Sequence, residues 1–369
     1  MSKITGFNPP PYPHDQLKDL AKVASVHDGG IINLSIGVPF DTPPSFTMNL
    51  LDNPEAARLY PPSTGTKEFC SAAADWLNKL SGTDINADMV KATVGSKEFV
   101  AGLPHWLKLR NPEKSKVLYP AVSYPTYAMG ATLANCEPVP VALDENWCLD
   151  LATIKQSDID QALCLWVNSP GNPSGAIDNL EAVVEWGRAN NVLIVSDECY
   201  IEFIWDGKPD SALNYATDGV LAVHSLSKRS NFAGLRSGFY AGDPQLVHYL
   251  GEVRKHSGFM QPGPVMLAAI AAMQDSEHVE IQRDVYLKRL QLLQNVFEKM
   301  GIETDLPGGA FYLWLKSPQG NGWDFARKLA EDVGMLVSPG DFYGKQSADY
   351  IRVAAVQPEE TIAPALNRI

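Results

Sequence analysis

The feature that most restricts the fold of this chain is a series of short apolar runs that alternate with helical patterns between residues 116 and 196. The runs at 116–119, 138–142, 163–167 and 192–196 predict strands, and the segments 124–133 and 179–188 predict helices. Strands that alternate with helices are typical of a mostly parallel sheet with helices on both faces. The sequence therefore predicts an α/β fold.

Polar residues follow the predicted strands closely. Asn172 comes after the run 163–167, Asp197 ends the run 192–196, and Lys228 comes after an apolar run at 221–224. In parallel α/β sheets, ligands bind beyond the carboxyl ends of the strands. We therefore expect these three side chains to meet in one site.

Lys228 lies in a serine- and glycine-rich stretch, 225–238, which we interpret as a loop between two strands. A lysine held beside cationic or apolar groups can lose its proton and attack a carbonyl carbon. The hydroxyls of Ser225 and Ser227, with the guanidinium of Arg236, can bind a phosphate nearby. Taken alone, however, a lysine in such a loop is more often a solvated surface residue.

Three further segments carry both a functional and a structural interpretation. Ser96 and Lys97 follow Gly95 at the start of a predicted helix, which favours either an anion site or an ordinary serine cap. Gly37 is either a simple turn or a point where backbone approaches a ligand closely. Arg352 lies inside an apolar strand, where a charge needs an anionic partner unless the strand is at the surface.

The remaining sequence predicts the domain organisation. A long helical pattern at 279–300, ended by Gly301, is expected to join a large domain at 46–275 to a small domain at 276–369. Residues 1–45 would form an N-terminal arm and part of the small domain. The prolines at 9–13 indicate a stiff, extended arm, which is either a disordered tail or a segment that lies over a partner subunit.

Composition excludes several classes of protein. A net charge of -13 disfavours binding to nucleic acid or to an anionic membrane surface. The five cysteines have no spacing typical of a metal site or a disulfide framework, and we expect no metal. The N-terminus has no signal-peptide pattern, and no window is apolar enough for a membrane span. A cytoplasmic protein is therefore expected.

Together, these segments resemble the fold-type I pyridoxal-phosphate enzymes, and among them the class I/II aminotransferases, from Gly37 to Arg352. The resemblance implies a large domain with a mostly parallel seven-stranded sheet flanked by helices, plus a smaller α+β domain. It also implies pyridoxal 5′-phosphate as cofactor, and amino acids and 2-oxo acids as small-molecule substrates.

The resemblance also implies roles for individual residues. Lys228 would form the aldimine with the cofactor and then carry the proton from the substrate α-carbon. Asp197 would pair with the pyridine nitrogen, and Tyr200 would bond the phenolic oxygen of the ring. The other cofactor contacts would come from Asn172, Tyr124, Ser96, Lys97, Ser225, Ser227 and Arg236. The substrate carboxylate would be bound by Arg352, Asn172 and Gly37.

Tyr60 matches a family tyrosine that reaches the phosphate in the neighbouring subunit. If this match holds, the active site is completed across a two-fold interface. The resemblance therefore implies a homodimer in which each subunit supplies Tyr60 to the other.

The runs at 225–239 and 168–175 are most similar to the actinobacterial type of succinyldiaminopimelate aminotransferase, an enzyme of lysine biosynthesis. This similarity implies exchange of an amino group between N-succinyl-LL-2,6-diaminopimelate and 2-oxoglutarate. Arg229 is a candidate for binding the distal carboxylate of these substrates, although a structural salt bridge is an equal alternative.

Three other functions stay open at this point. The chain could be an aminotransferase for aspartate, aromatic amino acids or kynurenine. It could be a β-lyase that acts on cystathionine with the same cofactor. A cofactor-binding sensor joined to a DNA-binding module is disfavoured, because the chain has no N-terminal helix-turn-helix pattern and no basic run.

Overall fold

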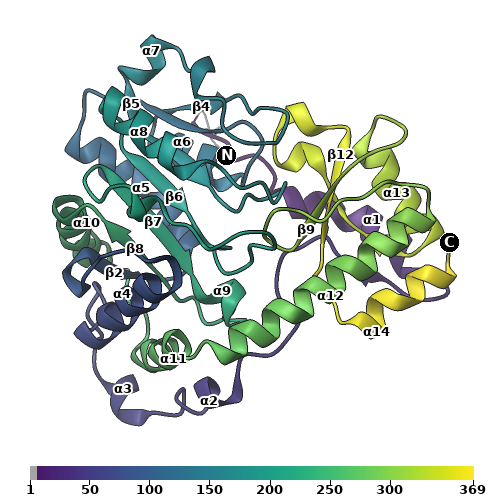
Figure 1. Ribbon diagram of the computed structural model, residues 1–369, viewed down its shortest axis with the longest axis horizontal. Helices are drawn as coiled ribbons and strands as arrows, with labels where there is room; N and C mark the ends of the chain where they lie inside the picture. The colour runs from purple at the N-terminus through teal and green to yellow at the C-terminus, as the bar shows by residue number, and fades with distance from the viewer. Residues whose placement is uncertain (1–5) are drawn as a thin grey trace, which may run out of the picture.

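The computed structural model describes residues 6–369, in which the long helix α12 (Glu277–Lys299) joins a larger part, built on one large sheet, to a smaller part with two small sheets (Figure 1). The larger sheet has seven strands in the order β2-β8-β7-β6-β5-β3-β4. Only β8 runs antiparallel to its neighbours, so the sheet is mostly parallel, as predicted. Its strands are β2 (Val90–Thr93), β3 (Lys116–Pro120), β4 (Glu137–Val141), β5 (Ala162–Asn168), β6 (Ile194–Asp197), β7 (Val220–Ser225) and β8 (Gly238–Gly242).

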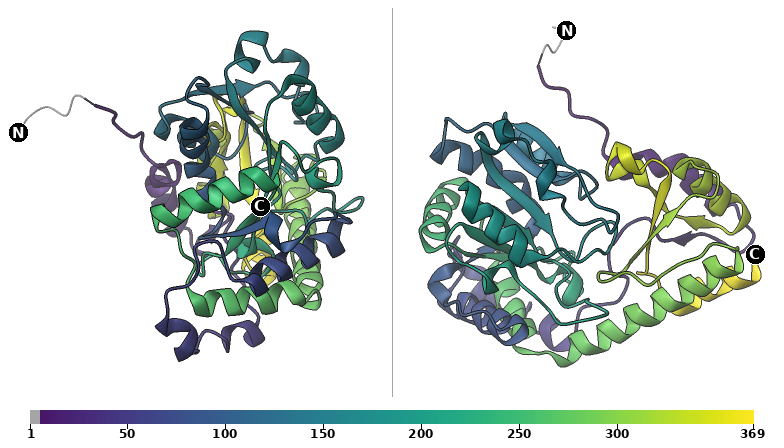
Figure 2. Two further views of the ribbon diagram at one scale, coloured as in Figure 1. Left: turned by 90° about the vertical axis from the view of Figure 1, so that its left-hand side faces the viewer. Right: turned by 45° about the horizontal axis from the view of Figure 1, so that its top comes forward.

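Helices cover both faces of this sheet (Figure 2). Every residue of β5 is buried, which is why this strand reads as a continuous apolar run rather than an alternating one. One face packs against α4 (Lys67–Ser81), α8 (Leu180–Asn190) and α11 (Gly263–Gln274). The other face packs against α5 (Ser96–Arg110), α6 (Thr126–Leu133) and α10 (Pro244–Ser257).

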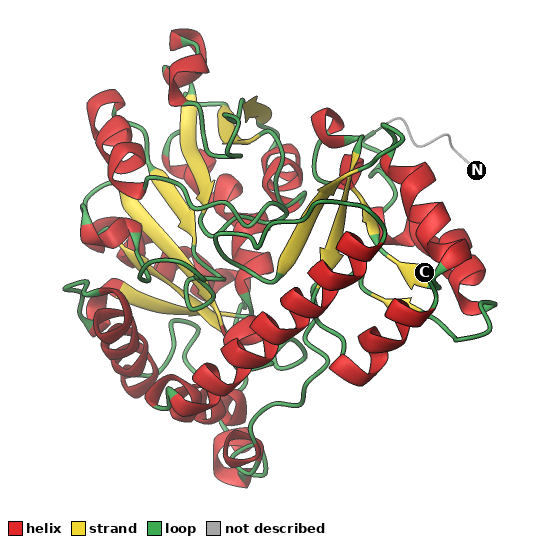
Figure 3. Ribbon diagram, turned by 45° about the vertical axis from the view of Figure 1, so that its right-hand side comes forward, coloured by secondary structure: helices red, strands yellow, loops and turns green. Residues whose placement is uncertain are grey.

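The smaller part of the molecule is built from both ends of the chain (Figure 3). It contains an antiparallel sheet in the order β11-β12-β9 and a parallel pair β1-β10. One buried cluster joins residues 17–34 to residues of α12 and the C-terminal segment. The division at residues 45 and 275 stays a prediction. The elements are α1 (Lys18–Ser25), β1 (Ile32–Asn33), β9 (Tyr312–Lys316), α13 (Gly322–Asp332), β10 (Met335–Leu336), β11 (Ser338–Pro339), β12 (Tyr350–Ala354) and α14 (Glu359–Ile362).

Some local predictions need correction. Lys228 does not lie in a loop but in a one-turn helix, α9 (Leu226–Arg229), whose first turn is capped by the side chain of Ser225. The helix predicted at 124–133 starts at Thr126, and the strand predicted at 192–196 starts at Ile194. The short helices α2 (Ser45–Met48), α3 (Pro54–Arg58) and α7 (Gln156–Ile159) complete the fold. No helix among residues 6–369 has the length and apolar character needed to span a bilayer.

Candidate active site

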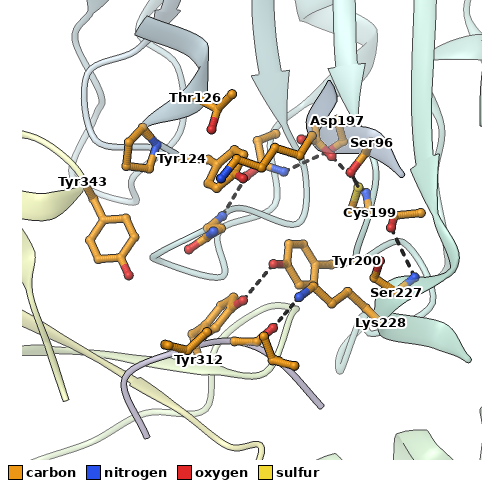
Figure 4. A pocket seen from close by; sticks show the side chains of 18 of the residues that line it. Ser96, Tyr124, Thr126, Asp197, Cys199, Tyr200, Ser227, Lys228, Tyr312 and Tyr343 are labelled. Atoms are coloured by element: carbon orange, nitrogen blue, oxygen red, sulfur yellow. Dashed lines mark hydrogen bonds between the residues drawn. The ribbon is translucent and has the colours of Figure 1, made fainter. Parts of the chain in front are cut away.

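A cavity of about 300 Å³ lies where the strands β5, β6 and β7 end, facing β9 and β12 of the smaller part. Figure 4 shows its side chains directed into one space from several elements. All the site residues predicted from the sequence except Tyr60 and Arg229 line this cavity: Gly37, Ser96, Lys97, Tyr124, Asn172, Asp197, Tyr200, Ser225, Ser227, Lys228, Arg236 and Arg352.

Lys228 extends from α9 into this cavity, and its amine donates a hydrogen bond to the backbone carbonyl of Gly37. Burial lowers the pKa of Lys228 to about 8, and the nearby positive charges of Arg352 and Arg236 act in the same direction. Burial has this effect because removing water penalises the ammonium more than the neutral amine. Lys228 is therefore not a solvated surface lysine, and a lowered pKa is what a lysine nucleophile requires.

Asp197 is buried at the end of β6, with its carboxylate held by two donors. The Tyr127 hydroxyl donates to Oδ2 at 2.8 Å, and the backbone N–H of Cys199 donates to Oδ1 at 3.3 Å. Burial raises the pKa of Asp197, while the hydrogen bonds from Cys199 and Tyr127 oppose this rise. The orientation of the carboxylate is thus set before any ligand binds.

The N-terminus of α5 and Arg236 lie together at one end of the cavity. Gly95, just before α5, has φ +72° and ψ 159°, and a Cβ built on it would lie 2.2 Å from Nη2 of Arg236. The guanidinium therefore occupies space that any other residue at position 95 would fill. The backbone N–H groups at a helix start, an arginine fork and the hydroxyls of Ser96 and Ser227 are suited to bind a phosphate.

Arg352 lies on β12 and is only 3% exposed, so it is not a surface-edge arginine. Its Nη1 donates to Oδ1 of Asn172 at 2.9 Å, and its Nη2 donates to the carbonyl of Ser35 at 2.8 Å. Its Nε is buried without a hydrogen-bond partner among residues 6–369. A buried guanidinium with a free donor is a binding point for an anion.

Two tyrosine hydroxyls meet beside Lys228. Tyr200 and Tyr312 lie 2.7 Å apart, and both side chains are buried (Figure 4). Gly37 lies directly against the Tyr312 hydroxyl, since a Cβ at position 37 would come within 2.1 Å of that oxygen. Gly37 therefore permits a close approach of backbone to the site, rather than merely making a turn.

The N-terminal arm reaches the cavity, which the sequence did not indicate. Tyr12, Pro13 and His14 line its mouth. The ammonium of Lys97 donates to the Tyr12 hydroxyl at 3.0 Å and lies 4.6 Å from the centre of the Tyr12 ring. Burial lowers the pKa of His14 to about 4, helped by the charge of Arg352, so this imidazole is neutral at physiological pH.

Tyr127 was also missed, although a signal was present. It follows Tyr124 by three residues within the helix predicted at 124–133, and side chains three apart in a helix lie on the same face, although α6 itself starts only at Thr126. Tyr312 had only its place in an apolar run, which indicates core packing equally well. Both became recognisable as site residues only through contacts with distant segments.

Two predicted residues lie outside the cavity. Tyr60 is 92% exposed, after the short helix α3. Arg229 is 3% exposed, and its Nε donates to Oε2 of Glu202 at 2.7 Å, so the substrate role considered for it is wrong and the salt-bridge alternative is confirmed. Within residues 6–369, no group of histidine, cysteine, aspartate and glutamate side chains is arranged to hold a metal ion.

Comparison with known proteins agrees with this geometry. Residues 29–369 match the family model described as aminotransferase class I and II. The chain is 38% identical to 4-dedimethylamino-4-oxo-anhydrotetracycline transaminase of Streptomyces rimosus, over 98% of this chain and 99% of that protein. It is 35% identical to LL-diaminopimelate aminotransferase of Aquifex aeolicus, over 98% of this chain and 96% of that protein.

A solved structure extends the similarity to three dimensions. The probable N-succinyldiaminopimelate aminotransferase of Thermus thermophilus superposes with a TM-score of 0.87 and 26% identity, covering 96% of this chain and 98% of that one. The family match spans all three sheets and every cavity residue except those of the N-terminal arm. The protein described here therefore belongs to the class I and II aminotransferases.

Proposed function

We propose that this aminotransferase exchanges an amino group between N-succinyl-LL-2,6-diaminopimelate and 2-oxoglutarate. The observation that carries the proposal is a cavity with two kinds of cation. Arg352 is buried, with no hydrogen-bond partner for its Nε among residues 6–369, and Lys97 is exposed at the mouth, beside the N-terminal arm. Both proposed substrates have an α-carboxyl or 2-oxo acid group at one end and a second carboxylate at the other.

Class I and II aminotransferases use pyridoxal 5′-phosphate, and the residues around the cavity fit it. Arg236 and the start of α5 supply phosphate donors, Lys228 supplies an amine that can bond its aldehyde, and Asp197 supplies a carboxylate for its ring nitrogen. When bound, this cofactor serves as an electron sink for the electrons that remain when the substrate loses its α-proton.

Each of the other proposed roles falls to a particular side chain of this protein. Lys228 is the base that we propose takes the proton from the substrate α-carbon, because its lowered pKa leaves a useful fraction of neutral amine near neutral pH. Asp197 keeps a neighbouring ring nitrogen protonated through its negative charge. Arg352 binds the substrate α-carboxylate through a planar fork of donors, with Asn172 fixing the orientation of that fork.

Lys97 and Tyr12 are our candidates for binding the distal carboxylate. The ammonium and the hydroxyl already lie within hydrogen-bond distance, and both line the mouth of the cavity. The neutral imidazole of His14 lies in the same arm and offers a further donor or acceptor. Lys97 thus replaces Arg229 as the proposed distal cation.

The names of the relatives support a second candidate. LL-Diaminopimelate aminotransferases recur among the relatives, at 29% to 35% identity over 98% of this chain. LL-Diaminopimelate carries an ammonium and a carboxylate at its distal end, whose charges cancel. The succinylated compound keeps that carboxylate, has a neutral amide in place of the ammonium, and carries a further carboxylate on the succinyl group. A cation at Lys97 therefore attracts the distal end of the succinylated compound more strongly than that of LL-diaminopimelate.

We further propose a homodimer in which Tyr60 completes the partner's active site. Tyr60 is 92% exposed and follows another exposed apolar side chain, Leu59 at 62%, and adjacent exposed apolar side chains of this size are typical of an interface. Sedimentation of the purified protein, with a Tyr60→Phe variant compared for cofactor affinity, tests this proposal. A monomer with full activity would contradict it.

The substrate is tested by adding amino acids one at a time to the cofactor-loaded enzyme and following the cofactor's absorbance. N-Succinyl-LL-2,6-diaminopimelate, LL-diaminopimelate, glutamate, aspartate, phenylalanine, kynurenine and cystathionine form the panel. Conversion by glutamate and the succinylated compound supports the proposal, whereas preference for LL-diaminopimelate selects the second candidate. Release of pyruvate from cystathionine without any 2-oxo acid would indicate a β-lyase instead.

A further inference from the structure

The residue after the lysine, Arg229, points away from the cavity into a buried polar cluster. Its guanidinium bonds Glu202 at 2.7 Å and the backbone carbonyl of Ala272, near the end of α11, at 2.8 Å. It also lies 5.2 Å from the ring centre of Trp76, whose Nε1 holds the other oxygen of Glu202 at 2.8 Å. Arg229 is thus fixed on several sides by α4, α11 and the segment after β6.

The next two residues continue this connection to the domain-joining helix. The hydroxyl of Ser230 lies 2.9 Å from Nε2 of His278, in the first turn of α12. The side-chain amide of Asn231 donates to Oε1 of Gln282, one turn further along α12, at 2.9 Å. The same amide donates to the backbone carbonyl of Thr42 at 3.3 Å.

Lys228 is therefore held from both sides. Its amine contacts the carbonyl of Gly37, and five residues later the same segment, at Thr42, is tied to Asn231. A helix of four residues has little stability of its own, because a single turn does not repay the cost of ordering its backbone. Besides the Ser225 cap, the side chains that follow Lys228 can therefore contribute to its position.

We infer that Arg229, Ser230 and Asn231 are positioning residues that anchor the Lys228 turn to α11 and α12, and so fix the amine where it removes the substrate α-proton. This inference rests on the proposed role of Lys228 but not on the identity of the substrate. A small displacement of a reacting group costs much of the rate, since about 1 Å of misplacement can cost on the order of 10²-fold.

The test uses the cofactor-loaded Arg229→Lys and Asn231→Gly variants. Asn231 has φ +58°, a conformation that glycine adopts freely. Asn231→Gly therefore removes the two hydrogen bonds of the side-chain amide without straining the backbone. We expect kcat to fall about tenfold in Arg229→Lys and several-fold in Asn231→Gly, with KM for the amino acid changed less than about twofold.

The deciding measurement is the deuterium isotope effect on kcat with an α-deuterated amino acid. If the amine is misplaced, proton removal becomes slower relative to the other steps, and the isotope effect rises in both variants. Lys116→Met is the matched control: it deletes a partly buried ion pair with Asp158 at 2.6 Å, on a strand away from the cavity. Its isotope effect should equal that of the wild type.

An unchanged kcat in both variants, or a lower kcat with an unchanged isotope effect at full cofactor occupancy, would overturn the inference. If Arg229→Lys does not fold, Asn231→Gly alone decides the matter. The measurement uses whichever amino acid the wild type converts, so a failure of the succinylated substrate leaves this test intact. A wild type that converts no amino acid would instead refute the proposed function.

Discussion

The phosphate end of the cavity gives the sharpest quantitative prediction, through Gly95→Ala. The new Cβ would lie 2.2 Å from Nη2 and 2.6 Å from Cζ of Arg236, well inside any allowed contact. The guanidinium must therefore leave its place beside the start of α5. In addition, the φ and ψ of Gly95 fall in a region that is essentially restricted to glycine, at a cost of about 1–3 kcal/mol in folding stability.

The effect on the cofactor follows from the displaced arginine. A hydrogen bond to a charged group contributes about 1.5–3 kcal/mol. Losing this contribution raises the dissociation constant of pyridoxal phosphate by roughly 10- to 150-fold. The assay is a titration of the apoenzyme with cofactor, followed by absorbance.

Gly82→Ala is the matched control. Gly82 also has a positive φ, +80°, after the last turn of α4, but a Cβ there meets no atom within 4 Å. This variant should lose about 1 kcal/mol of stability and keep its cofactor affinity. If the two variants bind the cofactor equally well, Arg236 does not hold the phosphate and the assignment of this end of the cavity fails.

Three further perturbations test the rest of the site. The rate of cofactor binding to the apoenzyme should increase about tenfold per pH unit up to a midpoint near pH 8 and then level off. The reason is that burial lowers the pKa of Lys228 to about 8 and only the neutral amine attacks the aldehyde. A midpoint two pH units higher would contradict the effect of burial on this pKa. Asp197→Asn should retain the cofactor yet lose on the order of 10²- to 10⁴-fold in kcat, since the amide keeps the shape but not the charge that protonates the ring nitrogen; single-turnover absorbance measures this, and a loss under tenfold would exclude that role. Arg352→Lys should raise KM for amino acids about 10- to 100-fold more than it lowers kcat, because a lysine keeps the charge but not the fork; steady-state kinetics with equal effects on both constants would argue against carboxylate binding.

Some of the site was predictable from local sequence. Asn172, Asp197 and Lys228 follow strands whose apolar runs are evident, and the carboxyl ends of neighbouring parallel strands meet at one edge of a sheet. Position along the chain was therefore sufficient to bring these three residues together. The start of α5 was also recognisable from local sequence, because Gly95 and Ser96 mark a helix terminus.

Other properties depended on contacts between segments far apart in the chain. The strand pattern around Arg352 allowed either a surface edge or a buried site, and only its bond to Asn172, 180 residues away, distinguishes them. The proline-rich arm predicted stiffness, but its path to the cavity depends on Tyr12 meeting Lys97, 85 residues away.

Arg229 shows most clearly why the sequence alone does not reveal which side chains face the cavity. Next to Lys228 in the sequence, it was a reasonable substrate ligand, because an exposed and a buried arginine look identical in a one-dimensional pattern. The direction of a side chain is decided by the turn of α9 and by what lies behind it, here Glu202 and Trp76. The sequence by itself determined where the strands lie along the chain and which residues stand at their ends. The tertiary structure decided which charged side chains face the cavity and which are paired in the core.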